Sequence, residues 1–229
     1  MAKKEQQQIH RSGFDFLAKL GKNNNRDWFN NHKDQYLQEL KLVEDFADAL
    51  LHKLSGHDLI ETASGKKSIY RIYRDTRFSN DKTPYKTHWS GSFKRATQQR
   101  RGGYYFHIEE GNSFVAGGFF GPVPEDLKLV RDDIAFDASP LRKILANKTF
   151  VSYFTSLRGE QLKTAPKGFP NDHEAIDLLR YKQFLLVRNF TDEQVLSPTF
   201  LEEADKTFRA MRPFFDYMSG VLTTNANGE

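Results

Sequence analysis

The sequence predicts an α+β protein in which helices pack on a mainly antiparallel sheet built around residues 89–120. Two runs of aromatic and β-branched residues, 103–109 and 113–120, flank Glu110-Gly111-Asn112, and this pattern is typical of a β-hairpin. Before these runs, apolar residues instead recur at intervals of three and four, which is the period of a helix. Together these observations favour a sheet in the middle of the chain with helices around it.

The N-terminal part of the chain is expected to form two helical regions. The first covers residues 12–20, with Ser12 as its N-cap. The second covers residues 25–54, where the apolar residues form one stripe along a helix. Gly56 is expected to end this second region.

The sheet region is expected to begin with a strand at residues 89–96, ahead of the hairpin. Gly117-Gly118 in the second arm of the hairpin indicates a bulge or a close approach of another backbone segment. In the first arm, strand alternation predicts two faces. The inward face carries Tyr104, Phe106 and Ile108, and the outward face carries Tyr105, His107 and Glu109.

The C-terminal half is expected to be mostly helical. One helix opens at Pro124 and another near Pro198, because proline suits the first turn of a helix, and Pro213 kinks or restarts the second of these. Between them we expect three short helices, at 140–146, 150–157 and 175–179, and one buried strand at 184–187.

Length and composition favour one globular domain. The 229 residues contain no cysteine, which excludes thiolate catalysis, disulfides and cysteine-ligated metals. No stretch approaches the roughly 20 apolar residues that a membrane span requires. We therefore expect a soluble, cytoplasmic protein with no membrane partner. Its single domain is expected over residues 12–222, between polar tails at 1–11 and 223–229.

The positive charge is concentrated in one segment. Residues 66–101 contain eleven Lys and Arg against two acids, Asp75 and Asp81, which gives this segment a charge of +9. The rest of the chain carries −5, so that the whole reaches +4. Charge concentrated in this way indicates an anionic partner for the segment.

The centre of the basic segment is the motif RIYRDTRFSNDKTPYK at residues 71–86. Its arginines, lysines and hydroxyl groups are donors for phosphate or carboxylate oxygens. Lys167, in the turn at 166–169, is a further candidate. The residues expected to bind a ligand are Arg71, Arg74, Arg77, Lys82, Tyr85, Lys86 and Lys167. In the alternative interpretation, Asp75 and Asp81 pair with the arginines and fix a loop that binds no ligand.

Three functions remain open from these residues. The first is binding of a small anionic or phosphorylated ligand, with processing of that ligand as an extension. If the protein catalyses a reaction, Asp75 or Asp81 is the candidate general base and His107 the candidate general acid. The second is a nucleic-acid-binding module in which aromatic residues of the same segment stack on bases. The third is a structural protein without catalysis. Whether the protein is an enzyme stays open. No cofactor is expected, and no metal, because the seven histidines lack metal-binding spacing.

The motif resembles the signature R-x-Y-R-D-x-R-F-S-x-D-K-x-P-Y-K of a widespread bacterial and fungal family of conserved hypothetical proteins, a domain of unknown function. The resemblance extends to Tyr104-Tyr105-Phe106 and to Pro166-Lys167-Gly168-Phe169, and it covers roughly Phe14 to Met218. It implies a single-domain soluble protein with a site at the motif, and it implies no particular reaction.

Overall fold

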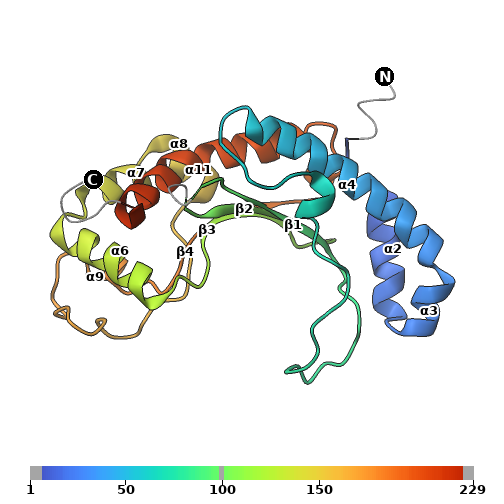
Figure 1. Cartoon of the computed structure of the whole chain (residues 1–229), viewed down its shortest axis with the longest axis horizontal. Coiled ribbons are helices and arrows are strands. Elements are labelled where there is room, and N and C mark those ends of the chain that lie inside the picture. The colour runs from blue at the N-terminus through green and yellow to red at the C-terminus, as the bar shows by residue number, and fades with distance from the viewer. Residues whose placement is uncertain (1–6, 98–100, 224–229) are drawn as a thin grey trace. The chain divides into compact units, whose positions relative to one another are not determined.

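The computed structural model describes residues 7–97 and 101–223 (Figure 1). Residues 1–6 and 224–229, which belong to the expected polar tails, lie outside the described part of the chain. The described helices are α2 (Arg11–Lys22), α3 (Arg26–Asn31), α4 (Lys33–Ser55), α5 (Gly65–Ser68), α6 (Pro124–Phe136), α7 (Ser139–Leu145), α8 (Lys148–Phe154), α9 (Ile176–Leu179), α10 (Asp192–Val195) and α11 (Phe200–Thr223). The described strands are β1 (Trp89–Lys94), β2 (Gly103–Ile108), β3 (Ser113–Phe119) and β4 (Phe184–Phe190).

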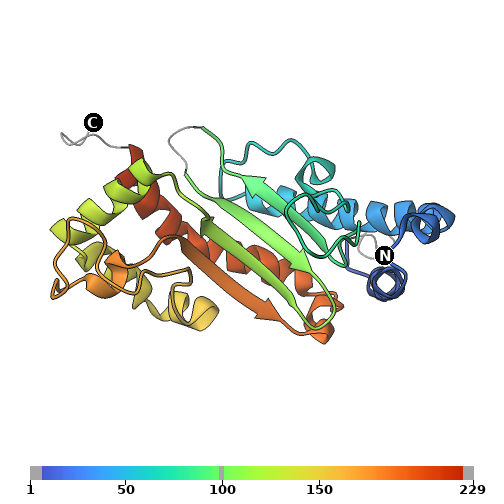
Figure 2. The ribbon, with the colours of Figure 1, turned by 90° about the horizontal axis from the view of Figure 1, so that it is seen from below.

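The four strands form one antiparallel sheet in the order β1-β2-β3-β4 (Figure 2). β2 and β3 form the predicted hairpin, in whose turn the Asn112 amide donates to the Glu109 carbonyl at 3.0 Å. Gly111 in this turn has a φ of +73°, a left-handed conformation that glycine adopts without steric cost. The prediction of an α+β fold with an antiparallel sheet is therefore confirmed.

The chain divides into two compact units, each assembled from several segments. The first unit contains the described residues up to Phe93, together with Tyr105–Val115 and Asn189–Lys206. The second contains the described residues of Lys94–Tyr104, together with Ala116–Arg188 and the described residues from Thr207 onward. The single domain expected over residues 12–222 stays a prediction.

Aromatic side chains form much of the core of the first unit. Phe46 of α4 contacts Phe106 of β2 and Phe200 of α11, with ring centroids 5.9 and 5.5 Å apart. Near α2, Phe16 and Tyr36 both pack against Trp89. Buried aromatic rings contribute large apolar areas, so these contacts hold α2 and α4 against β1 and β2 within this unit.

Two expectations for the N-terminal helices were wrong. Ser12 is not the N-cap of the first helix, because α2 already begins at Arg11 with His10 as its cap. The Ser12 hydroxyl donates instead to the Glu39 carboxylate of α4, at 2.9 Å. The region expected at 25–54 is two helices, α3 and α4, which are separated at His32.

In the second unit, α11 packs closely on β3. A Cβ atom on Gly117 would lie 2.5 Å from the Met211 sulfur, and one on Gly118 would lie 2.1 Å from the Phe184 carbonyl oxygen. The close approach predicted for Gly117-Gly118 is therefore confirmed. α11 continues through Pro213 and does not restart there. No helix within the described residues is long and apolar enough to cross a membrane.

Candidate functional site

The basic motif forms the two arms of an irregular hairpin in the first unit. Isolated antiparallel bridges join Ile69 to Gly91 and Tyr73 to Tyr85. Between these bridges, the Lys86 amide donates to the carbonyl of Ile72 at 2.8 Å. The motif is therefore not helical, and residues 74–84 form the loop beyond the second bridge.

Two of the three motif arginines form ion pairs inside this loop. Arg74 contacts the Asp81 carboxylate at 2.5 Å. Arg77 holds Asp75 with two nitrogens, Nη2 to Oδ2 at 2.7 Å and Nε to Oδ1 at 3.0 Å. These pairs agree with the alternative interpretation of the sequence, in which the two acids of the motif neutralise its arginines.

The same contacts set the acidity of the two carboxyl groups. The backbone amide of Thr83, followed by the Arg74 side chain, lowers the pKa of Asp81 to about 2. The Arg77 side chain lowers the pKa of Asp75. A lowered pKa makes a carboxylate a weaker general base, so these contacts do not favour the catalytic role considered for Asp75 or Asp81.

Acids from distant parts of the sequence neutralise two further cations of the segment. In the second unit, Arg95 donates to Asp216 at 2.7 Å and to the Ser219 hydroxyl at 3.2 Å. Arg101 pairs with Asp126. Part of the +9 charge is thus removed by residues that lie far away along the chain.

Three of the expected ligand-binding residues have other surroundings. Tyr85 is a core residue, 3% exposed and stacked on Phe29 with ring centroids 4.1 Å apart. The exposed Lys82 donates to the Thr76 carbonyl at 2.9 Å. Lys167 belongs to the second unit, where it lies exposed in a turn closed by the Phe169 amide and the Pro166 carbonyl.

Arg71 and Lys86 differ from the paired arginines. Arg71 is exposed and forms no hydrogen bond or ion pair with the described residues. Lys86 is half-buried, and its ammonium lies 5.5 Å from the centre of the Tyr70 ring. Burial, followed by the nearby charge of Arg71, lowers the pKa of Lys86. Arg71 also acts on Asp75, but the oxygens of that carboxylate are bound to Arg77. Two neighbouring cations therefore remain without a directly bound acid.

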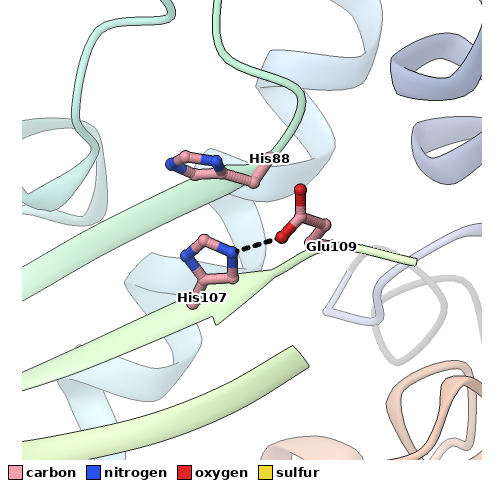
Figure 3. A group of neighbouring side chains, drawn as sticks. All are labelled: His88, His107 and Glu109. Atoms are coloured by element: carbon pink, nitrogen blue, oxygen red, sulfur yellow. Dashed lines mark hydrogen bonds and ion pairs between the residues drawn. The ribbon is translucent and has the colours of Figure 1, made fainter. Parts of the chain in front are cut away.

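Next to Lys86 along the chain, the outward face of the sheet carries the histidine–glutamate cluster of His88, His107 and Glu109 (Figure 3). The rings of His88 and His107 have centroids 4.2 Å apart. His107 Nε2 lies 3.1 Å from Glu109 Oε2, and its Nδ1 lies 3.1 Å from the Tyr105 hydroxyl. One potential ligand atom from each residue of the cluster lies within 4.8 Å of the other two.

The β2 strand positions two members of this cluster. The side chains at 104, 106 and 108 are at most 1% exposed and face the core, as predicted from alternation. His107 and Glu109 share the opposite face because residues two apart in a strand point the same way. His107 is nevertheless only 8% exposed, and its ring stacks on Phe114 of β3 at 4.7 Å.

The surroundings fix the ionisation of the other two members. Burial, followed by the neighbouring His107, lowers the pKa of His88 to about 4, so this imidazole is neutral at pH 7. Burial acts to raise the pKa of Glu109, but hydrogen bonds from Asn112 and His107 outweigh it and lower this pKa. The cluster thus presents a neutral imidazole beside a carboxylate. Burial raises the pKa of Tyr105, which keeps its phenol protonated.

Sequence reasoning found one member of this cluster and missed two. His107 was expected as a candidate acid, whereas His88 and Glu109 were assigned no role and no metal site was expected. The spacing of His107 and Glu109 was a usable signal, because it places both side chains on one face of a strand. His88 had no such signal, since it lies 19 positions before His107 and meets it through the pairing of β1 with β2.

Fold and site together describe an α+β protein whose antiparallel sheet carries a histidine–glutamate cluster beside two neighbouring cations. The model of the DUF2461 family, described as conserved hypothetical proteins, matches residues 12–217, and the chain belongs to this family. This finding confirms the resemblance predicted from the sequence. No curated protein and no solved structure matches the chain. The description of the family gives no ligand and no reaction.

Proposed function

We propose that the protein binds a small anionic or phosphorylated ligand through Arg71 and Lys86, beside the histidine–glutamate cluster. The observation that carries this proposal is the position of two neighbouring cations with no directly bound acid, in a motif whose arginines Arg74 and Arg77 are both paired. The proposal thus assigns ligand binding to fewer residues than the sequence predicted.

The electrostatics favour an anion at this place. Like charges that lie close together disfavour each other, and the lowered pKa of Lys86 reflects both its burial and the charge of Arg71. An anion bound between them would relieve this repulsion. The Arg71 guanidinium can hold two oxygens of a phosphate or carboxylate at once, and the Lys86 ammonium supplies a compact second charge.

A chain of contacts within the first unit connects these cations to the cluster. Lys86 lies over the Tyr70 ring, and the Tyr70 ring lies 6.3 Å from that of Tyr105. The Tyr105 hydroxyl in turn contacts His107. A ligand held at Arg71 and Lys86 would therefore be linked through two tyrosines to a histidine, the residue type that most often transfers protons in catalysis, and this continuity supports processing as an extension of binding.

Thermal unfolding with a panel of anions tests the proposal. The panel contains inorganic phosphate and phosphorylated and carboxylated metabolites, each titrated at constant ionic strength. We expect at least one compound to raise the melting temperature in a saturable way, because a ligand at about 100 times its dissociation constant stabilises the folded state by roughly 2.7 kcal/mol. The Arg71→Gln, Lys86→Gln double variant should lose this response.

Arg77→Gln is the matched control, since it removes a motif arginine that is exposed and already paired with Asp75. It should keep the response to the stabilising anion. An equal loss of response in Arg77→Gln would argue against Arg71 and Lys86 as the specific binding groups. A panel without any stabiliser would refute the proposal.

Binding of nucleic acid is the second candidate, and one observation favours it. The motif loop exposes aromatic rings: Tyr73 is 54% exposed and Phe78 is 96% exposed, with the Arg77 guanidinium 5.8 Å from the Phe78 ring centre. Aromatic and arginine side chains together stack on single-stranded bases. Affinity for an oligonucleotide that falls steeply with salt, and that Phe78→Ala weakens, would favour this candidate over the small anion.

A further inference from the structure

We infer that His88, His107 and Glu109 form a binding site for one divalent transition-metal ion. Each residue offers a ligand atom, and the three atoms lie within 4.8 Å of one another on one face of the first unit's sheet (Figure 3). His107 Nε2 and Glu109 Oε2 are already 3.1 Å apart. Two ligands about 2.1 Å from a shared ion in tetrahedral geometry lie roughly 3.4 Å apart, so this pair is close to the required separation.

His88 is the residue that a metal ion explains best. A hydrogen bond between His107 and Glu109 satisfies those two side chains without any ion. His88 takes no part in that bond. Its ring packs against the His107 ring and forms no hydrogen bond with the described residues. His88 therefore has no such bond to break when its ring binds an ion, and one of its nitrogens already lies within 4.8 Å of the ligand atoms of His107 and Glu109.

Groups around the cluster already hold two of the ligands in place. The Tyr105 hydroxyl meets Nδ1 of His107, which leaves Nε2 as the nitrogen that faces Glu109. Asn112 donates to Glu109 at 2.8 Å, and the Thr87 hydroxyl donates to the same carboxylate at 3.4 Å. Hydrogen bonds of this kind orient metal-binding histidines and carboxylates and fix the histidine tautomer.

The ligand types indicate which ions the site would take. Two imidazoles and one carboxylate suit Zn²⁺, Fe²⁺, Mn²⁺, Co²⁺ or Ni²⁺, whereas Mg²⁺ and Ca²⁺ prefer oxygen ligands throughout. Because the sequence has no cysteine, no thiolate competes for the ion elsewhere in the chain. Three protein ligands leave at least one position of a tetrahedral ion for water or a ligand. The inference does not depend on the proposed anion, since it involves neither Arg71 nor Lys86.

The test is a titration of the full chain, without an affinity tag and after treatment with chelator, with ZnCl₂ by calorimetry and with CoCl₂ by visible absorption. We expect one ion per chain and a cobalt spectrum of a nitrogen and oxygen site. His88→Gln, His107→Gln and Glu109→Gln should each weaken Zn²⁺ binding by at least about tenfold, because even residues that only support metal ligands have effects of that size.

His52→Gln is the matched control, because His52 is an exposed histidine of α4 outside the cluster. It should bind Zn²⁺ as the unaltered protein does. Arg71→Gln should also keep Zn²⁺ binding, which separates a failure of this inference from a failure of the proposed anion binding. Circular dichroism checks that each variant folds. If His107→Gln does not fold, the Zn²⁺ affinity of the His88→Gln variant decides the outcome. Unchanged affinity in a folded His88→Gln variant, or no binding by the unaltered chain, would overturn the inference.

Discussion

The imidazole ring of His88 lies against that of His107, with centroids 4.2 Å apart and planes inclined by 32°. His88 directly precedes β1 and His107 lies in the neighbouring strand β2, so the pairing of these strands creates the contact. Two touching imidazoles repel each other when both are charged. The low pKa of His88, due first to burial and then to His107, means that this ring stays neutral at pH 7.

Replacing Tyr105 with phenylalanine should weaken Zn²⁺ binding about tenfold without unfolding the protein, because the hydroxyl that orients His107 is lost while the ring stays. Calorimetric titration measures the change. Tyr70→Phe is the matched control, since its hydroxyl bonds to Ser92 and not to the cluster. If both variants bind Zn²⁺ as the unaltered chain does, Tyr105 does not support the site.

The carboxyl group of Asp81 should titrate at about pH 2 when followed by NMR of its side-chain carbon. Its folded-state pKa lies below the ordinary value of 3.8, so its contribution to stability is present above that pH and is lost as the pH falls toward 2. Arg74→Ala should raise the midpoint only part of the way to 3.8, because the larger contribution, from the Thr83 amide, remains. A midpoint near 3.8 in the unaltered protein would show that neither the Thr83 amide nor Arg74 binds this carboxylate in solution.

Gly118→Ala should lower the free energy of unfolding by about 2–4 kcal/mol. The glycine has a φ of +141°, and an added Cβ would lie 2.1 Å from the Phe184 carbonyl oxygen of the neighbouring strand. Denaturant unfolding measures the loss. Gly220→Ala is the control, because an added Cβ would meet no described atom within 4 Å beyond its chain neighbours and the backbone of its own helix, and alanine favours a helix. Equal stability of the two variants would contradict the close approach at Gly118.

The sequence predicted the parts of the fold that depend on local pattern. Alternation placed Tyr104 and His107 on opposite faces of β2, and Pro124 marked the start of α6. The four-residue helices α5 and α10 were not predicted, whereas α9, of the same length, was. A signal for α10 was present, since Thr191 and Gln194 have the spacing of a capping box and form one.

The candidate site was predicted less completely, for two physical reasons. The first is strand pairing: it brings His88 to His107, and no local pattern in the sequence marks which residues of β1 and β2 lie side by side. The second is distance along the chain, because Asp216 and Asp126 neutralise Arg95 and Arg101 from far outside the basic segment. The charge of the segment was counted correctly from the sequence. The number of cations left for a ligand was overestimated, because only the acids within the segment were set against them.

The ion pair between Arg95 and Asp216 has a consequence for the order in which the protein matures. The fully buried Arg95 side chain lies near the middle of the sequence, and its carboxylate partner is in the last helix. On the ribosome, Arg95 is made 121 residues before Asp216, the acid that neutralises it. The second unit can therefore close around this charge only after Asp216 has been made, because a buried guanidinium is costly without its carboxylate partner.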